Sequence, residues 1–215
     1  MKSKNDQQWQ DRYSRQMLFS EIGEAGQIQL QQKIVVIIGI GALGTVVAEL
    51  LTRAGIGHLQ LIDRDIVELS NLQRQLLFTQ QDVGRSKAVA AAEHLKAINE
   101  NCVVESLPLH LSAKYCSILA AADVIVDCTD NMATRFLINE YCKQEKKSWV
   151  HGAAIREEGY VFTILPGGPC LNCFAKNSSL ETCATAGVLN TTTTMVGTIQ
   201  VIIAIKILLG KEIEP

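Results

Sequence analysis

Residues 33–44 read KIVVIIGIGALG and carry the clearest structural signal in the chain. After Lys33, residues 34–38 are all apolar and β-branched, which is typical of a strand buried on both faces of a sheet. The last six, residues 39–44, match the pattern G-x-G-x-x-G, whose glycines allow a tight turn and bring a phosphate close to a helix N-terminus. Residues 42–54 have helical apolar spacing and are followed by Gly55. The stretch predicts a strand, a nucleotide-binding turn and a helix.

Outward from this stretch, strands and helices alternate along the chain. We expect further strands at residues 58–62, 102–107, 124–128, 148–150 and 160–165. We expect further helices at residues 85–99, 113–121, 133–143 and 187–209. This alternation predicts an α/β fold with a doubly wound, mostly parallel sheet and helices on both faces.

We expect one continuous domain with three parts. Residues 1–32 form an N-terminal arm and helix, residues 33–153 the nucleotide-binding part, and residues 154–215 a C-terminal part. Within the last part, residues 171–186 are polar and have no period, which is typical of a functional or mobile loop.

Composition and charge exclude several classes of protein. The 215 residues are 47% hydrophobic and 20% charged, which excludes a disordered chain, and the net charge of −2 gives no support to nucleic-acid binding. The polar N-terminus lacks the apolar core of a secretory signal, and residues 195–209 are too short for a membrane span. We therefore expect a cytoplasmic protein that binds neither nucleic acid nor membrane.

Seven cysteines are an odd number, so they cannot all pair within the chain. Five stand singly, several of them in apolar runs, and we expect these to be free thiols in a reducing compartment. They are Cys102, Cys116, Cys128, Cys142 and Cys183.

The glycine turn and Asp63 together indicate a nucleotide. Asp63 ends the strand at 58–62, roughly 20 positions after the glycines, where an acidic residue binds a ribose hydroxyl. Arg74, in SNLQRQ, and Lys87, in GRSK, follow on loops near the same end of the sheet. Each alone would pass as a solvated surface charge. Two cations beside a glycine turn suit a triphosphate better than NAD, because charge grows on a leaving pyrophosphate.

Asp130 belongs to the sequence DCTDN at residues 127–131, after the strand at 124–128. A carboxylate that faces phosphates is a magnesium ligand or the partner of a cation. Asp130 could also cap the helix that begins near Asn131, and the two roles are compatible.

Six motifs, in this order and spacing, resemble the ThiF/MoeB/HesA family, bacterial relatives of the ubiquitin-activating enzymes. They are RYSRQ (12–16), GIGALG, SNLQRQ, GRSK, DCTDN and GAA (152–154), and the resemblance runs from about residue 11 to residue 210. It implies a Rossmann-like fold with a crossover loop and a long final helix. It also implies an ATP-dependent adenylyltransferase that acts on the C-terminal Gly-Gly carboxylate of a ubiquitin-like sulfur carrier protein. That reaction releases pyrophosphate and serves thiamine, molybdopterin or related sulfur-transfer biosynthesis.

The resemblance also assigns roles to single residues. It implies ATP binding by Gly39, Gly41, Gly44, Asp63, Asn71, Gln73, Arg74, Lys87, Asp130 and Asn131. Arg74, Lys87 and Asp130 would also act in catalysis, Asp130 with magnesium. Cys183 matches a loop cysteine that in some members links covalently to the carrier, and an unreactive thiol is the alternative.

Arg15 matches an arginine that reaches the phosphates bound by the other subunit of a homodimer. On the residues alone, 12–16 would be a mobile arm with surface charges. A two-fold homodimer also agrees with the final helix, where residues 201–208 are apolar on most faces. A sulfurtransferase is a further candidate partner.

Cys170 and Cys173 form a C-x-x-C pair, in the family half of a four-cysteine zinc site. The second pair normally lies beyond the final helix, so the chain resembles a C-terminally shortened member. The sequence could be a fragment, the site vestigial, or the other ligands supplied by another chain. A redox pair is disfavoured because the cysteines do not open a helix after a strand.

Two other functions compete with catalysis of adenylation. One is a shortened, weakly active homologue that binds a carrier protein without efficient catalysis. The other is an NAD-dependent oxidoreductase, which rests on the glycine turn alone.

Overall fold

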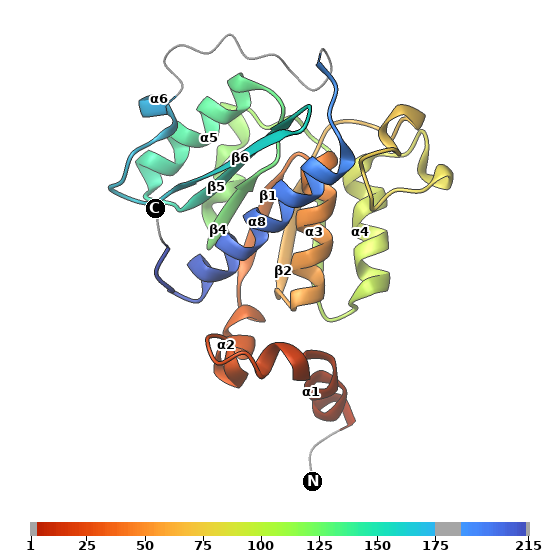
Figure 1. The fold of residues 1–215 in the computed structure, drawn as a ribbon, viewed down its shortest axis with the longest axis vertical. Coiled ribbons are helices and arrows are strands. Elements are labelled where there is room, and N and C mark those ends of the chain that lie inside the picture. Colours follow the sequence, from red (N-terminus) through yellow and green to blue (C-terminus); the bar gives the residue numbers. More distant parts are fainter. Residues whose placement is uncertain (1–3, 175–185, 214–215) are drawn as a thin grey trace.

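The computed structural model describes residues 4–174 and 186–213, and this part of the chain forms a six-stranded sheet. The strands are β1 (Ile34–Ile38), β2 (His58–Ile62), β3 (Val103–Leu107), β4 (Val124–Asp127), β5 (Trp149–Ile155) and β6 (Glu158–Ile164). Their spatial order is β3-β2-β1-β4-β5-β6, and every neighbouring pair is parallel except the β5–β6 hairpin (Figure 1). The predicted doubly wound, mostly parallel α/β sheet is confirmed.

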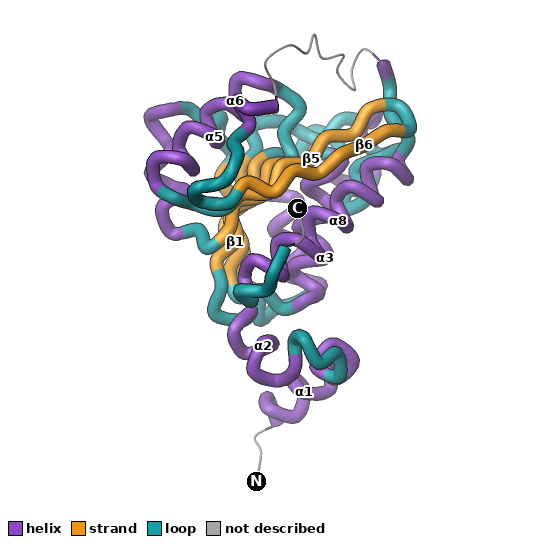
Figure 2. Tube along the Cα trace, turned by 60° about the vertical axis from the view of Figure 1, so that its left-hand side comes forward, coloured by secondary structure: helices purple, strands orange, loops and turns teal. Residues whose placement is uncertain are grey.

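Helices cover both faces of this sheet (Figure 2). On one face lie α3 (Ala42–Ala54), α4 (Lys87–Ile98) and α8 (Asn190–Leu208), and on the other lie α5 (Met132–Glu145) and the 3-10 helix η3 (Ala113–Ala121). Val35 and Ile37 of β1 pack into the first layer, whereas Val36 and Ile38 pack into the second. This alternation explains the continuous apolar run at β1, because each neighbouring side chain has its own core to enter.

The predicted helix at residues 113–121 is a 3-10 helix rather than an α-helix. Leu119 is its buried residue, and the other side chains are exposed or partly exposed. With so little apolar surface to bury, the segment gains little from forming a regular amphipathic helix.

Helix α8 (Asn190–Leu208) is shorter than the predicted helix at residues 187–209. It has 19 residues and a mean hydropathy of 1.5, enough by length and composition to cross a membrane, but 44% of the apolar window is buried inside the fold. It packs on α3, where a Cβ at Gly197 would meet the Val46 side chain at 3.0 Å, and on β5. These contacts make α8 a core helix, although Met195, Ile199 and Ile202 remain exposed.

The N-terminal region is folded, contrary to the expectation of an arm at residues 12–16. Helix α1 (Lys4–Met17) and helix α2 (Gly23–Leu30) lie at the end of the sheet where the strands begin (Figure 1). Tyr13 is buried, and its hydroxyl accepts a hydrogen bond of 2.9 Å from Nδ2 of Asn99, the residue after α4. Trp9 lies one turn earlier and packs edge-on against Tyr13. Trp9 and Tyr13, four positions apart, are the sequence signal for a helix that docks here.

Short helices complete the described fold. They are η1 (Leu69–Asn71) and η2 (Gln80–Asp82), between β2 and α4, and α6 (Leu171–Phe174), after β6. Three single cysteines, Cys102, Cys128 and Cys142, are buried free thiols, as predicted, and Cys116 is partly exposed.

Candidate active site

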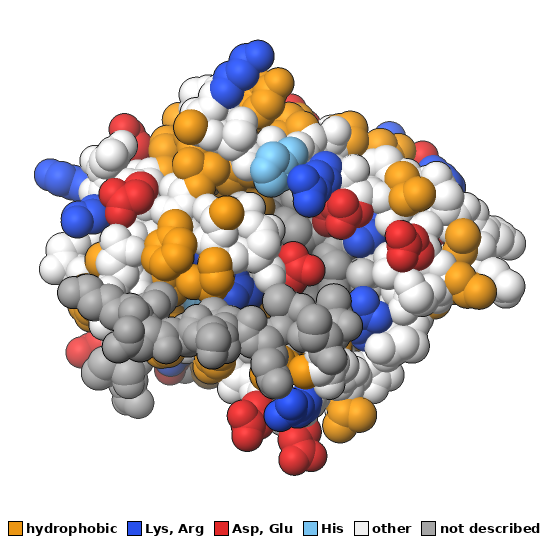
Figure 3. Space-filling model, turned by 90° about the horizontal axis from the view of Figure 1, so that it is seen from above, with side chains coloured by type: hydrophobic (Ala, Val, Ile, Leu, Met, Phe, Trp, Pro, Cys, Tyr) orange, Lys and Arg blue, Asp and Glu red, His pale blue; other side chains and the backbone are white. Residues whose placement is uncertain are grey.

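A cavity of about 1040 Å³ opens at the carboxyl ends of β1, β2 and β4. Strand β1 pairs with β2 on one side and with β4 on the other, so the strand order reverses at β1. Open α/β sheets bind ligands at such a point. Acidic and basic side chains gather around the hollow when the molecule is viewed from this end (Figure 3). The sequence-predicted residues that line it are Gly39, Gly41, Asp63, Asn71, Arg74, Lys87, Asp130 and Asn131.

The glycine turn builds one wall of the cavity. Gly39 has a φ of +87°, and a Cβ there would lie 2.8 Å from the carbonyl oxygen of Cys128. Gly41 precedes α3 and faces open space, since a Cβ there would meet only Nε2 of Gln75, at 3.8 Å. Gly44 does not line the cavity. A side chain at Gly44 would collide with the carbonyl oxygen of Gly39, so this glycine lets α3 start directly against the turn.

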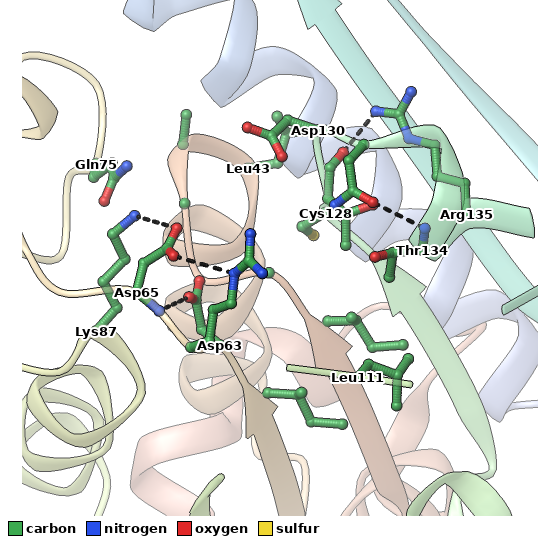
Figure 4. Close-up of a pocket in the computed structure, with 18 of the residues that line it drawn as sticks. Leu43, Asp63, Asp65, Gln75, Lys87, Leu111, Cys128, Asp130, Thr134 and Arg135 are labelled. Carbon is green, nitrogen blue, oxygen red and sulfur yellow. Dashed lines mark hydrogen bonds and ion pairs between the residues drawn. The ribbon is translucent and has the colours of Figure 1, made fainter. Parts of the chain in front are cut away.

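Asp63 joins the turns that follow β1 and β2. Its Oδ2 accepts a 2.6 Å hydrogen bond from the backbone N–H of Ile40, and its Oδ1 accepts one of 2.8 Å from the N–H of Asp65. Burial raises the pKa of Asp63, although these two hydrogen bonds and Lys87 oppose the effect. The carboxylate lies at the cavity wall beside the glycine turn (Figure 4), where the ribose of a nucleotide is expected.

The two predicted cations both reach the cavity. Lys87 is the first residue of α4, is 7% exposed, and has its Nζ 3.5 Å from Oδ2 of Asp65 (Figure 4). Arg74 donates from Nη1 to the carbonyl oxygen of Ser70 at 2.9 Å. The structure therefore brings the positive charges of SNLQRQ and GRSK to the same cavity as the glycine turn.

Within SNLQRQ, the structure selects Gln75 rather than Gln73. Gln73 is exposed and does not line the cavity, whereas Gln75 lines it and is 4% exposed. The backbone N–H groups of Arg74 and Gln75 both bond to the carbonyl of Asn71, so this segment forms a helical turn. Residues 71, 74 and 75 share one side of such a turn, and 73 points elsewhere. The Oε1 of Gln75 is buried without a hydrogen-bond partner in the described chain, which leaves it available to a ligand.

A buried carboxylate that the motifs did not reveal holds the loop before Lys87. Asp82 accepts hydrogen bonds from the backbone N–H of Thr79 (2.8 Å), from the Thr79 hydroxyl (2.9 Å) and from Nη1 of Arg85 (3.1 Å). Its Oδ2 also lies 2.8 Å from Nε2 of His94. Burial alone would raise the pKa of Asp82, but the bonds from Thr79 and His94 outweigh it and lower the pKa to about 2. This network ties η2 to α4 and so fixes where Lys87 begins its helix.

Asp130 is exposed and points into the cavity (Figure 4). The predicted N-cap role belongs to its neighbour: Oδ1 of Asn131 accepts the backbone N–H of Thr134 at 2.9 Å and caps α5. Asp130 forms no hydrogen bond or ion pair with any residue that the structure describes. A single unengaged carboxylate facing a phosphate site fits magnesium, which proteins hold through one or two carboxylates together with substrate phosphates.

Further side chains line the cavity that the motifs had not assigned. Besides Gln75, they include Arg64, His110, Arg135 and Tyr160. The motifs did not assign these residues to the site, and the fold brings them to the cavity from different loops and elements.

Cys170 directly precedes α6, the short helix after β6, so the expectation that the pair does not open a helix after a strand is wrong. The Sγ atoms of Cys170 and Cys173 are 3.9 Å apart. Burial opposes ionisation of Cys170, but hydrogen bonds from the Asn172 backbone and from Cys173 lower the pKa of its thiol. Two thiolates on one tetrahedral zinc are about 3.8 Å apart for Zn–S distances near 2.3 Å, so the pair fits two zinc ligands. Within residues 4–174 and 186–213 no third ligand joins them.

Besides Gly44 and Gln73, the predicted residue Arg15 also lies away from this cavity. Arg15 is exposed on α1, at the opposite end of the sheet (Figure 1), so within one chain it does not meet the cavity. Cys183 lies outside the described residues.

The ThiF family model matches residues 13–215. The chain is 42% identical over 210 residues to the sulfur carrier protein ThiS adenylyltransferase of Bacillus subtilis, covering 95% of this chain and 62% of that protein. It is 39% identical over 206 residues to the SAMP-activating enzyme E1 of Haloferax volcanii, covering 94% of this chain and 76% of that protein. The chain thus spans less than two thirds of the length of the Bacillus protein.

Solved structures share the same fold. The crystal structure of E. coli MccB with ATP matches with a TM-score of 0.80 at 25% identity, covering 93% of this chain and 64% of that one. The crystal structure of PaaA matches with a TM-score of 0.77 at 26% identity, covering 100% of this chain and 70% of that one. Since the family model runs from within α1 through every element of the sheet to residue 215, the chain belongs to the ThiF family.

Proposed function

We propose that this protein adenylates the C-terminal carboxylate of a ubiquitin-like sulfur carrier protein, of the ThiS or MoaD type, that ends in Gly-Gly. The observation that carries the proposal is that one cavity brings together the glycine turn, Lys87, Arg74 and Asp130, whose carboxylate has no hydrogen-bond or ion-pair partner among the described residues. Relatives named as a ThiS adenylyltransferase and a SAMP-activating enzyme support this reaction. The related MccB structure with ATP supports the choice of nucleotide.

The reaction needs no strong base, because a C-terminal carboxylate is already ionised at neutral pH. One of its oxygens attacks the α-phosphorus of ATP, and the bond from that phosphorus to the bridging oxygen of the β-phosphate breaks. The electron pair leaves with pyrophosphate, and an acyl adenylate remains. Catalysis is then a matter of positioning the carboxylate and neutralising the charge that grows on the leaving group.

The residues of the cavity suit these two tasks. The glycine turn presents the start of α3 to the phosphates, and Lys87 and Arg74 offset the charge on the departing pyrophosphate. Asp63 stands where it can receive the ribose. Asp130 would hold magnesium, which when bound neutralises and orients phosphate oxygens.

The far side of the cavity suits a slender chain terminus. Ala153, Ala154 and Ile155 of β5 line it together with Tyr160 of β6. The two alanines are small and Ile155 is apolar, which suits an extended Gly-Gly segment beside the nucleotide. The carrier that reacts will assign the protein to thiamine biosynthesis, molybdopterin biosynthesis or related sulfur transfer.

The test is ATP–pyrophosphate exchange with purified candidate carriers. We expect exchange that requires both magnesium and a carrier, and that stops when the terminal glycine of that carrier is removed. Tight carrier binding without exchange would instead identify a weakly active homologue that only binds the carrier. Calorimetry adds a second test: ATP should bind and NAD should bind negligibly, and the reverse result would contradict the proposal.

A further inference from the structure

The three residues before Asp130 form a turn at the floor of the cavity, in which Asp127 is buried while Cys128 and Thr129 line the cavity. Asp127, the last residue of β4, is 0% exposed. Its Oδ1 accepts the backbone N–H of Thr129 at 2.9 Å and the Thr129 hydroxyl at 2.7 Å. The carboxylate of Asp127 therefore folds residues 127–129 into a tight turn, and Asp130 leaves this turn directly into the cavity.

Side chains from three different elements hold this turn. Nδ1 of His151, on β5, lies 2.7 Å from Oδ2 of Asp127. Nη2 of Arg135, on α5, donates to the carbonyl oxygen of Thr129 at 2.6 Å. Nε2 of Gln200, on α8, donates to the carbonyl oxygen of Asp127 at 2.8 Å. The exposed fractions of His151 and Gln200 are 1% and 0%, so water does not compete for their bonds, and Arg135, which borders the cavity, is 7% exposed.

Packing alone does not account for so many buried polar groups. Replacing buried ionic groups by apolar residues of similar size is often neutral or stabilising, so a purely structural layer here would not need them. Arg135 also keeps its Nε buried without a hydrogen bond in the described chain, 4.0 Å from Oδ2 of Asp127. Burying these polar groups lowers the stability of the fold, and their hydrogen bonds fix the geometry of the turn at residues 127–129.

The neighbouring glycines show how closely the turn is fitted. A Cβ at Gly152, in the GAA motif, would lie 2.5 Å from the Gln200 side chain, so this glycine makes room for Gln200 to reach the turn. A Cβ at Gly39 would lie 2.8 Å from the carbonyl oxygen of Cys128, so the turn packs directly on the nucleotide-binding turn. A displacement of residues 127–129 would therefore move both Asp130 and the glycine turn.

We propose that His151, Arg135 and Gln200 are positioning residues that hold the Asp127–Thr129 turn and thereby fix the carboxylate of Asp130 for its metal ion. This role rests on the proposed function, in which Asp130 binds magnesium with ATP. Partners that orient a metal ligand typically contribute 10- to 100-fold in metal affinity or activity.

The experiment compares His151→Leu, which removes the donor to Asp127, with His151→Asn, whose amide keeps an N–H near the position of Nδ1. Mn²⁺ serves as the probe, and its binding is measured by electron paramagnetic resonance in the presence of a non-hydrolysable ATP analogue. We expect His151→Leu to weaken Mn²⁺ binding about tenfold, and His151→Asn to retain most of it. Asp130→Asn provides the reference loss, and Gln200→Met is a second variant that removes one donor at nearly constant shape.

The outcomes separate the two proposals. If Asp130→Asn weakens Mn²⁺ binding while folded His151→Leu and Gln200→Met proteins bind it like the wild type, the positioning role is wrong and the adenylation proposal stands. If His151→Leu does not fold, Gln200→Met decides in the same assay. A wild-type protein that binds Mn²⁺ and nucleotide but shows no exchange with any carrier would overturn the proposed function, and the positioning role would still be measured.

Discussion

Arg74 and Asp130 bring opposite charges into the cavity from its two sides, one from the loop after β2 and the other from the loop after β4. Neither lies in the core, so neither is required for the sheet to form. We predict that Arg74→Ala and Asp130→Ala each lower the rate of carrier-dependent exchange by roughly 10²-fold or more, because each removes charge stabilisation of the transition state. Urea titrations should show nearly unchanged stability. An exchange rate close to that of the wild type in either variant would contradict the assignment of that residue.

Gln75 and Gln73 offer a matched pair, since the same side chain stands in two environments two positions apart. Gln75→Ala should raise the KM for ATP roughly fivefold or more. The ligand then loses the polar partner that the buried amide of Gln75 offers. Gln73→Ala should change this KM less than twofold. The comparison fails if both variants behave alike.

Sequence reasoning located the cavity residues that belong to compact motifs. Gly39, Asp63 and Lys87 follow strand ends, and the ends of parallel strands meet at one edge of a sheet. It chose Gln73 over Gln75 because the helical turn at residues 71–75 is not visible as a pattern. It missed the His151–Asp127 contact because the two residues are 24 positions apart and meet only through the pairing of β4 with β5.

At the scale of elements, the loop from η2 to α4 depends on a single buried carboxylate. The pKa of Asp82 is about 2, below its usual value of 3.8, so the folded state favours the ionised form. The resulting stability is fully present at neutral pH and is lost as the pH falls from about 4 toward 2. Since one pKa unit corresponds to about 1.4 kcal/mol, the contribution is about 2 kcal/mol.

Asp82→Asn should therefore lower the free energy of unfolding by about 2 kcal/mol at pH 7, and by about half as much at pH 3. Urea midpoints of both proteins at the two pH values measure this difference. A constant difference across pH would show that the loss comes from packing rather than from the charge of Asp82.

The ends of an element could be predicted where glycines or polar residues border it in the sequence. Helix α3 and strand β2 begin and end as predicted, because glycines and Asp63 border them. Helix α1 was overlooked because most of its residues are polar, and its stability comes from Tyr13 docking against Asn99, more than 80 positions away. The periodicity of a local stretch of sequence does not predict a contact between residues so far apart in the chain.

The cavity lies at the carboxyl ends of the parallel strands, whereas helix α1, which carries Arg15, lies at the other end of the sheet (Figure 1). If Arg15 acts on phosphates, it must do so in a second copy of the chain. The exposed apolar residues Met195, Ile199 and Ile202 along α8 offer surface that a partner could cover. We therefore keep the two-fold homodimer as a proposal, with Arg15 completing the site of the partner.

Mixing two inactive variants tests this arrangement. Arg15→Ala and Arg74→Ala chains should regain part of the exchange activity when combined, because a mixed dimer holds one intact site. A mixture that stays inactive while light scattering shows subunit exchange would rule out action across the interface. Scattering that finds monomers alone at micromolar concentration would rule out the dimer.

The three buried cysteines can report local opening of the fold, because a thiol reagent reaches each of them only when the structure around it opens. Burial raises the pKa of Cys102 to about 11, that of Cys142 to about 12, and that of Cys128 as well, so their reactive thiolate forms are scarce at neutral pH. An alkylating reagent should therefore modify Cys170 and Cys173 before these three. Mass spectrometry of the labelled peptides should find Cys128 protected until the turn beneath the cavity separates from α8. Because Cys102 lies beside β3 and Cys142 within α5, the order of their labelling would show which layer of the protein loosens first.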